Sequence, residues 1–307
     1  MTDRLMLLDT ASLYFRAFYG VPDSVAGADG RPINAARGLL DMIAKLVALY
    51  EPTHLIACWD DDWRPQWRVD LIPSYKAHRV AEEIVAAPDV EVVPDPLEHQ
   101  LPAIRDELHA LRIPVVGVAH HEADDVIGTY ATISTIPVDV VTGDRDLFQL
   151  IDDDRDVRVI YTGRGMSNLE VHTGHTTTEK YGITPSQYAD FAVLRGDPSD
   201  GLPGVAGIGE KTATTLLARY GTLAGIIDAA ESDERLSAGV RAKILEAADY
   251  LAVAPRVVAV VRDLEVPVGI TDARITRPDA AVVASVAEKW GLGASLTRAT
   301  DALAARS

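Results

Sequence analysis

The sequence predicts an α/β fold in which helices flank a mostly parallel central sheet. Helical patterns alternate with short apolar runs at residues 4–9, 54–59, 113–118 and 138–142. Alternation of this kind is typical of parallel sheets, whose strands are joined by crossover helices. Beyond about Gly182 the pattern becomes helical, which predicts a second region built of helices.

The helices expected between the strands follow from their apolar periodicity. They lie at residues 11–19, 34–50, 99–111, 122–133 and, as a short piece, near 146–150. Residues 196–209 carry too many glycines and prolines for regular structure, and a helix at 210–220 follows them. The rest of the chain is Ala-rich and helical, with one strand expected at 256–261. The acidic, proline-containing segment 81–96 is expected to be a mobile excursion.

The composition is ordinary for a soluble globular protein, with 48% hydrophobic and 24% charged residues in a chain of 307. No apolar run reaches the length of a membrane span, and the first run becomes charged at Asp9, too early for a signal peptide. A single cysteine, Cys58, excludes an intrachain disulfide and is expected to be a buried strand residue. We therefore expect a cytoplasmic protein with no membrane partner.

The formal net charge of −17 would not be expected of a protein that binds nucleic acid. Affinity for DNA comes largely from basic residues that neutralise phosphates. Either the protein binds no nucleic acid, or its acidic residues gather where cations bind and its basic residues act locally. The net charge does not decide between these interpretations. The arrangement of the acidic residues along the sequence has to decide between them.

Acidic residues come just after the predicted strands, as Asp9, Asp60, Glu122 and Asp144 show. Ligands of parallel sheets bind beyond the carboxyl ends of the strands, so these side chains should lie along one edge. The full set of candidate metal ligands is Asp9, Asp60, Glu122, Asp124, Asp125, Asp144, Asp146, Asp197 and Asp200.

Carboxylates that converge repel one another, and they persist only where protons or cations compensate. Mg²⁺ or Mn²⁺ suits such oxygen ligands, and the Cys/His set that zinc prefers is lacking. Two such ions, about 4 Å apart, suit in-line attack on a phosphodiester. For single residues a plainer interpretation stays open: Glu122 or Asp144 could cap a helix, and Asp197 or Asp200 could be turn residues.

Six segments, in this order, resemble the 5′ nuclease family, which comprises flap endonucleases and the 5′→3′ exonuclease domain of bacterial DNA polymerase I. They are LLDTAS at 7–12 with Arg16, WD at 59–60, PSYKAHR at 73–79, EADDVIG at 122–128, TGDRDL at 142–147 and GDPSDGLPGVAGIGEKTA at 196–213. The resemblance covers nearly the whole chain and implies a free-standing bacterial member. It implies a PIN-like nuclease core at 1–180 with a helical arch near 70–105, and a helical DNA-binding region at 181–307 with a helix–hairpin motif near 196–220.

The resemblance also implies catalytic roles. One divalent ion would be held by Asp9, Asp60, Glu122 and Asp144, with Asp124 or Asp125 direct or through water. The second would take Asp146, Asp197 and Asp200, with Asp124 nearby. Lys76 and Arg79 would clamp the scissile phosphate, and Arg16 would bind the terminal phosphate or the neighbouring backbone.

Nucleic-acid contacts are implied in two places. Phe15, with Tyr14 beside it, stands where the family often has Tyr, and a Phe ring can also stack on an unpaired base. In the helix–hairpin motif Gly207, Gly209 and Lys211 would meet a DNA phosphate, and the backbone carbonyls of Val205 and Ile208 would hold a potassium ion. Two departures from the family pattern concern acidic residues: Asp61 and Asp62 follow the second strand, and residues 80–93 contain neither Lys nor Arg.

The expected activity is hydrolysis of phosphodiesters at 5′ flaps, nicks and gaps in branched duplex DNA, in primer removal and repair, by a monomer. An RNA primer–DNA hybrid could share the same surface. Three alternatives are weighed: a catalytically weak DNA-binding paralogue, a related nuclease acting on RNA, and a phosphatase of the haloacid-dehalogenase type. The phosphatase would need a second Asp two residues after Asp9, where this chain has Ala11.

Overall fold

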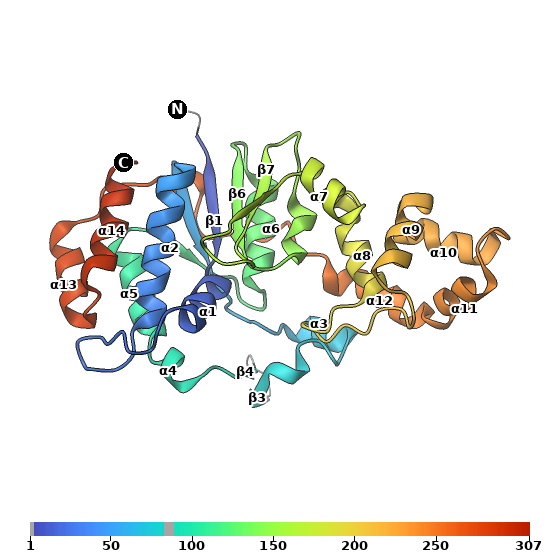
Figure 1. Ribbon diagram of the computed structural model, residues 1–307, viewed down its shortest axis with the longest axis horizontal. Coiled ribbons are helices and arrows are strands. Elements are labelled where there is room, and N and C mark those ends of the chain that lie inside the picture. The colour runs from blue at the N-terminus through green and yellow to red at the C-terminus, as the bar shows by residue number, and fades with distance from the viewer. Residues whose placement is uncertain (1–2, 83–88) are drawn as a thin grey trace.

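The central sheet has six strands in the order β5-β2-β1-β6-β7-β8. Figure 1 shows β1, β6 and β7 side by side at its centre. This computed structural model describes residues 3–82 and 89–307. The strands are β1 (Leu5–Asp9), β2 (His54–Cys58), β5 (Val115–Val116), β6 (Val138–Thr142), β7 (Val157–Tyr161) and β8 (Glu170–His172). All neighbouring pairs are parallel except β7 with β8, so the predicted mostly parallel sheet is confirmed.

Helices cover both faces of the sheet because β1 is apolar on both sides. Leu5 and Leu7 pack into one core with α6 (Ala123–Ile133), whereas Met6 and Leu8 pack into a second core with α2 (Asn34–Tyr50). Successive side chains of a strand point to opposite faces, so an uninterrupted apolar run predicts burial on both. Cys58 lies fully buried in β2, as expected, and burial raises the pKa of its thiol.

Three further helices complete the layer on the α2 side: α1 (Thr10–Gly20), α5 (Leu101–Ala110) and α14 (Gly293–Ala304). The C-terminal helices α13 (Ala280–Trp290) and α14 return to this side, where α13 packs on α5 and α14 on α2 (Figure 1). The last part of the predicted region 181–307 therefore lies against the sheet domain. The division of the chain at residue 180 remains a prediction.

The segment expected to form a helical arch contains little helix among its described residues. It includes α3 (Gln66–Leu71), the 3-10 turn η1 (Ala77–Arg79), an antiparallel pair β3 (Val80–Glu82) with β4 (Val90–Glu91), and α4 (Asp95–Glu98). Pro94 precedes α4 and Pro96 lies in its first turn. Proline is well tolerated at such positions, because an N–H in the first turn of a helix has no intrahelical partner to lose. The centre of the predicted excursion 81–96 lies outside the described residues.

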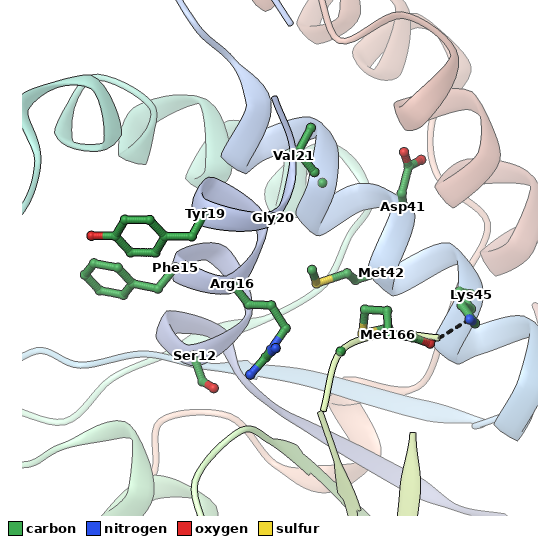
Figure 2. A pocket seen from close by; sticks show the side chains of 12 residues that line it. Ser12, Phe15, Arg16, Tyr19, Gly20, Val21, Asp41, Met42, Lys45 and Met166 are labelled. Carbon is green, nitrogen blue, oxygen red and sulfur yellow. Dashed lines mark hydrogen bonds between the residues drawn. The ribbon is translucent and has the colours of Figure 1, made fainter. Parts of the chain in front are cut away.

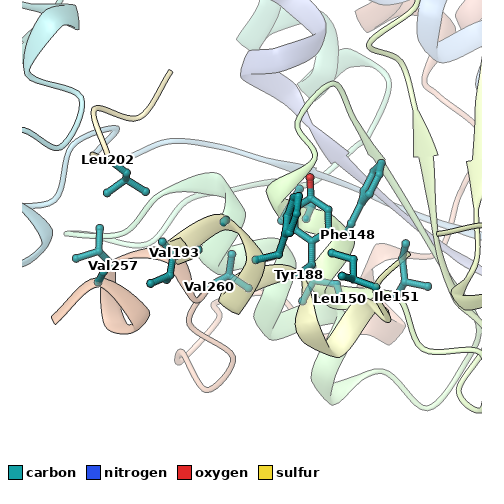
Figure 3. Close-up of a cluster of buried hydrophobic side chains, with 14 of the residues drawn as sticks. Phe148, Leu150, Ile151, Tyr188, Val193, Leu202, Val257 and Val260 are labelled. Carbon is teal, nitrogen blue, oxygen red and sulfur yellow. The ribbon is translucent and has the colours of Figure 1, made fainter. Parts of the chain in front are cut away.

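Beyond β8 the chain is helical. The elements are α7 (Gly174–Tyr181), η3 (Pro185–Gln187), α8 (Tyr188–Arg195), α9 (Glu210–Tyr220), α10 (Leu223–Ser232), α11 (Ala238–Glu246), α12 (Ala248–Val258) and η4 (Ile270–Ala273). Helices α9, α10 and α11 lie at the opposite end of the molecule from α13 (Figure 1). The cluster around η2 (Asp146–Leu150) joins both parts, since Phe148 and Tyr188 pack together and the same core includes Val193 and Val257 (Figure 3).

The strand expected at residues 256–261 is wrong. Helix α12 continues to Val258, and the backbone N–H groups that follow donate to side chains instead of a sheet. Val260 donates to Oε1 of Gln149 and Val261 to Oδ1 of Asp125, at 3.1 and 2.8 Å. Buried backbone donors must find partners, and here polar side chains from η2 and α6 provide them. Among the described residues, no helix combines the length and the apolar character needed to cross a membrane.

Candidate metal and nucleic-acid site

Acidic side chains from three strand ends meet at the carboxyl edge of the sheet. Asp9 ends β1, Asp60 and Asp144 follow β2 and β6 by two residues, and Glu122 precedes α6. A cavity of about 360 Å³ opens here, and its acidic lining includes Asp9, Asp60, Glu122, Asp124, Asp144 and Asp197. A smaller adjoining cavity is lined by Asp146 and Asp200 together with Glu122 and Asp124. Eight of the nine predicted ligands thus border two connected spaces.

Burial and mutual repulsion raise the pKa values of these carboxyl groups. Burial, with Asp60 and Asp144 adding to it, raises the pKa of Asp9 to about 7, although Thr142 and the backbone of Ser12 donate hydrogen bonds to it. Burial and the charges of Asp9 and Asp144 raise the pKa of Asp124 well above its usual range. The carboxyl edge therefore disfavours negative charge unless cations compensate.

The second group of acids behaves in the same way. Burial and the charges of Asp144, Asp200 and Asp197 raise the pKa of Asp146 well above its ordinary value. Burial also raises the pKa of Asp60 and of Asp200. Within the ranges 3–82 and 89–307, no three Asp, Glu, His or Cys side chains form a ready-made coordination group. The donor set nevertheless fits hard divalent cations, because it consists of crowded carboxylate oxygens around a polar cavity.

Glu122 is the exception, because cationic side chains already surround it. Its Oε1 accepts from Arg68 at 3.1 Å and from the hydroxyl of Tyr75 at 2.7 Å, and its Oε2 accepts from the ammonium of Lys76. Burial alone would raise the pKa of Glu122, but the charges of Lys76 and Arg68 outweigh it and lower the pKa. Glu122 is therefore ionised and links the acidic edge to the segment that carries Lys76.

Asp125 is the predicted ligand that the structure turns away from the others. It is fully buried, and its two oxygens accept from the guanidinium of Arg68 at 2.7 and 2.9 Å. The N–H of Val261 donates to the same carboxylate at 2.8 Å. Neither cavity at the carboxyl edge includes Asp125 in its lining. The residue acts as a buried anchor for Arg68, because adjacent helical positions point in different directions.

Lys76 and Arg79 lie beside the acidic cavity and line it. Lys76 adopts a left-handed backbone conformation, with φ at 48°, and its N–H donates to the carbonyl of Asp200 at 2.9 Å. Such a conformation is unusual for a non-glycine residue and is found where surrounding contacts hold it. The guanidinium of Arg79 donates to the carbonyl of Ser199 and approaches Asp200 at 3.4 Å.

The loop 196–202 carries the last two acids and is fixed to the segment of Lys76. Asp197 accepts from Arg195 at 3.1 Å and from the N–H of Ser199 at 2.9 Å. The hydroxyl of Ser74 donates to the carbonyl of Gly201 at 2.7 Å. Gly201 has φ at 69°, and a Cβ there would lie 2.0 Å from the carbonyl oxygen of Ser74, so only glycine fits this contact.

The aromatic pair and Arg16 on α1 take different positions. Tyr14 is buried and packs on Trp59 with ring centroids 5.8 Å apart, so it is not available to stack on a base. Phe15 is half-buried and lines the acidic cavity. Arg16 has no hydrogen bond or ion pair with any described residue, and its Nε is buried without a partner. An unpaired buried donor is costly, so the Nε–H of Arg16 retains the capacity to donate to an acceptor from outside the chain.

The helix–hairpin motif forms a tight turn before α9. The carbonyl of Val205 accepts from the N–H of Ile208 at 2.9 Å, and Gly207 adopts φ at 73°. Gly209 precedes the first turn of α9, where no side chain caps the helix, and Lys211 is exposed in that turn. The N–H groups of this helix end, which no side chain caps, therefore lie among exposed residues, beside one acidic side chain, Glu210, and one basic side chain, Lys211.

Two residues outside the predicted set contribute to these sites. Arg68 of α3 is almost fully buried and joins Glu122, Asp125 and the carbonyl of Val257. Lys243 of α11 donates to the carbonyl of Gly207 at 3.0 Å and so adds a cation to the hairpin. An arginine five residues before the Pro73–Arg79 segment offers a weak sequence signal for Arg68, whereas Lys243 has none because it is 36 residues from Gly207 in sequence.

Comparison with known proteins connects this geometry to a family. Residues 4–182 match the N-terminal resolvase-like domain of the 5′-3′ exonucleases, and residues 183–281 match their C-terminal SAM fold. A 5′-3′ exonuclease of Streptomyces coelicolor is 58% identical, and the match covers 98% of this chain and 100% of that protein. A 5′-3′ exonuclease of Mycobacterium tuberculosis is 47% identical over 99% of this chain and 98% of its own length.

Solved structures share the fold at lower identity. The D15 protein of T5, co-crystallised with metal ions, has a TM-score of 0.64 and 18% identity, and the match covers 99% of each chain. Human GEN1 bound to Holliday junction DNA has a TM-score of 0.64 and 15% identity, with 96% of this chain and 71% of that one covered. These likenesses agree with the architecture, while the sequence matches identify the relatives. The chain belongs to the 5′-3′ exonuclease family.

Proposed function

We propose that the protein is a structure-specific 5′ nuclease that hydrolyses phosphodiesters at 5′ flaps, nicks and gaps in duplex DNA. The observation that carries this proposal is the polar cavity at the carboxyl edge, where seven acidic side chains, Glu91 among them, lie beside Lys76, Arg79 and Arg145. A site that combines crowded carboxylates with cationic side chains is suited to a phosphate ester and its metal ions.

The proposed cofactor is Mg²⁺ or Mn²⁺, with two ions per site. The first would be held by Asp9, Asp60, Glu122, Asp124 and Asp144, and the second by Asp146, Asp197 and Asp200. When bound, such ions neutralise the carboxylates, lower the pKa of a coordinated water and stabilise charge on the leaving oxygen. Asp125 is left out of the proposed set because it lines neither cavity at the carboxyl edge.

The protein's own cations would orient the reacting phosphate. Lys76 lines the cavity while its ammonium is held by Glu122, so it is placed beside the site before substrate arrives. Arg79 is more exposed and borders the same cavity, where it can bind a second phosphate oxygen. Groups that are fixed in advance stabilise developing charge without reorganising, which is the larger part of electrostatic catalysis. Phe15, which lines the same cavity, offers a ring on which an unpaired base can stack.

Duplex binding is proposed for the hairpin before α9. Lys211 and Lys243 would meet backbone phosphates together with the free N–H groups near Gly209, and the carbonyls of Val205 and Ile208 would hold a potassium ion. These contacts involve only the sugar–phosphate backbone, so we expect recognition of DNA shape and not of sequence. The net charge of −17 is compatible with this binding, because the cations act locally and bound metals offset the acids.

The biological setting proposed is removal of displaced flaps and of RNA primers during DNA replication and repair in the cytoplasm, by a monomer. Support comes from relatives: DNA polymerase I of Mycobacterium tuberculosis is 43% identical over 73% of this chain, which matches 24% of that longer protein. An RNA primer paired to DNA presents the same kind of duplex backbone to the hairpin. A polymerase I relative is consistent with a nuclease that works on the strand ahead of synthesis.

A substrate panel tests the proposed function. Labelled 5′-flap, nicked, gapped, blunt-duplex and single-stranded DNA, and one flap with an RNA 5′ segment, are incubated with Mg²⁺, Mn²⁺ or EDTA. We expect cleavage near the junction that leaves a 5′-phosphate, and no cleavage in EDTA. Asp144→Asn and Asp146→Asn should abolish cleavage while the circular dichroism spectrum is retained. Cleavage in EDTA, or near-normal turnover of either variant, would contradict the proposal.

A further inference from the structure

A second, larger cavity of about 870 Å³ lies along α1 on the side of the acidic site, and we refer to it as the α1–α2 groove. Its walls are Phe15, Arg16, Tyr19, Met42, Lys45 and Met166 (Figure 2). Ser12 and Phe15 line both the groove and the acidic cavity, so the two spaces are neighbours. The volume is within the range of sites that bind small organic ligands and exceeds what a water cluster needs.

The polar feature of the groove is Arg16, which lacks a partner. The chain carries 46 acidic residues, yet no described carboxylate pairs with Arg16, and its Nε is buried without any acceptor. Its guanidinium lies over Gly143, where a Cβ would be 3.3 Å from Nη2, so it is directly beside the turn that carries Asp144. A fixed guanidinium of this kind suits a phosphate or a carboxylate. An anion held here would lie next to the acidic cavity.

The other charges of the groove are already engaged. Asp41 accepts two hydrogen bonds from Arg298, at 2.9 and 2.7 Å, and one from Ser295. The ammonium of Lys45 donates to the carbonyl of Met166 at 2.7 Å and so fastens the loop after β7 to α2 (Figure 2). Arg16 is therefore the one cation among these groove residues whose side chain makes no hydrogen bond with the described part of the chain. A negative group of a ligand is best placed beside it.

The remaining walls are apolar and lie on two sides of Arg16. Phe15 and Tyr19 project together from one side of α1, and Tyr19 is 73% exposed. Met42 and Met166 lie on the other side of Arg16 (Figure 2). Thioether side chains pack well on the faces and edges of flat rings, and aromatic rings stack on them. An anion beside a flat ring is the chemistry of a nucleotide, with its phosphate on Arg16 and its base on the methionine side.

A base can enter this groove only when it is unpaired, because the faces of a base in a duplex are covered by its neighbours. We propose that the α1–α2 groove binds one unpaired nucleotide of the strand being cut. Arg16 holds its phosphate, and its base lies against Met166 and Met42, where Gly165 and Gly38 also line the groove. This proposal rests on the proposed function for the identity of the strand. A base that is bound in the groove therefore affects the affinity for the substrate, although it does not adjoin the bond that is cut.

A combined scan of substrate and protein tests the proposal. The unpaired nucleotides of a 5′-flap DNA are replaced one at a time by an abasic nucleotide, and affinity is measured by fluorescence anisotropy in EDTA, where no cleavage interferes. We expect one position at which loss of the base weakens binding about tenfold, as for a stacked base. Met166→Glu should weaken binding of the intact flap by a similar factor, and it should remove the effect of the abasic position.

The control is Leu49→Glu, which adds the same charge to an exposed position of α2 outside the groove and should leave every affinity unchanged. If the losses of affinity caused by Met166→Glu and by the abasic nucleotide were additive, the proposal would be overturned. It would also be overturned if no abasic position weakened binding. Equal weakening of a fully paired duplex by Met166→Glu would also overturn it. Cleavage of the intact flap in Mg²⁺ is measured in parallel. If no DNA is cut, the proposed function fails, while the anisotropy still decides whether the groove holds a base.

Discussion

Asp124 and Asp125 are adjacent acids for which the structure implies opposite effects of the same substitution. Asp124 borders the acidic cavity, and burial and the charges of Asp9 and Asp144 raise its pKa. Asp125 is buried against Arg68, with two hydrogen bonds at 2.7 and 2.9 Å and a third from a backbone N–H at 2.8 Å. Replacing each by Asn therefore separates a metal ligand from a structural anchor.

The expected change in the free energy of unfolding differs in sign between the two variants. Breaking a buried ion pair by neutralising one partner costs about 3 kcal/mol, out of a total stability of about 5–15 kcal/mol. Asp125→Asn should be destabilised by that amount, because the guanidinium of Arg68 then keeps only Glu122 as a charged partner. Asp124→Asn should be more stable than the original chain in EDTA at neutral pH, since a folded-state pKa above the unfolded one means that ionisation opposes folding.

Urea unfolding followed by tryptophan fluorescence in EDTA measures the stabilities, and flap cleavage in excess Mg²⁺ measures the activities. Asp125→Asn should retain cleavage within about tenfold at a temperature where it is folded, whereas Asp124→Asn should lose cleavage by at least about 100-fold. Arg68→Met provides a matched test, because it should be destabilised like Asp125→Asn. If Asp125→Asn lost cleavage while its stability stayed unchanged, the assignment of Asp125 to Arg68 would be refuted.

Four further outcomes are expected. The pKa of Asp9 is about 7 in the folded protein, against an ordinary value of 3.8. Without metal, ionisation of this group therefore lowers the stability of the fold as the pH rises from 3.8 to about 7, by about 4 kcal/mol in total, and Asp9→Asn should remove that slope in urea titrations. Glu107 is fully buried without a hydrogen-bond partner, and burial raises its pKa, so Glu107→Gln should stabilise the protein above pH 4.5 and leave it unchanged in more acidic solution. Lys76→Ala combined with Arg79→Ala should lower kcat about 100-fold while DNA affinity in EDTA falls only about threefold, as single-turnover cleavage and anisotropy would measure. Lys243→Met should weaken duplex binding at every sequence and reduce the slope of log affinity against log salt by about one, with kcat unchanged.

Each of these outcomes has a result that contradicts it. A pH slope that survives in Asp9→Asn would assign the titration to other carboxyl groups, and a destabilised Glu107→Gln would imply an unseen donor. Parallel losses of affinity and kcat in the double alanine variant would show that Lys76 and Arg79 only bind. For Lys243, the control is Lys180→Met, because Lys180 of α7 pairs with Glu170 of β8. An equal effect of both variants would show that only the overall charge of the protein matters.

The sequence predicted most of the sheet and the position of the acids. The apolar runs before Asp9 and around Cys58 are buried on both faces, and burial on both faces is what an unbroken apolar run requires. β7 and β8 were not predicted. β7 alternates polar and apolar residues in part, and β8 has three residues, so neither gives a long apolar run. The strand expected at 256–261 failed because its β-branched residues lie in α12 and in a segment held by Gln149 and Asp125.

For the candidate site, too, part of the arrangement followed from the sequence and part followed only from the tertiary structure. The sequence by itself determined that acids end several parallel strands, because strand direction places their carboxyl ends at one edge. Only the tertiary structure decided where each carboxylate points: Asp124 to the cavity, Asp125 to Arg68, and Glu122 to Lys76. Partners such as Arg68 and Lys243 come from distant helices, and side-chain direction depends on packing that no local pattern encodes. The groove beside Arg16 likewise exists only because α1, α2 and the loop after β7 meet in space.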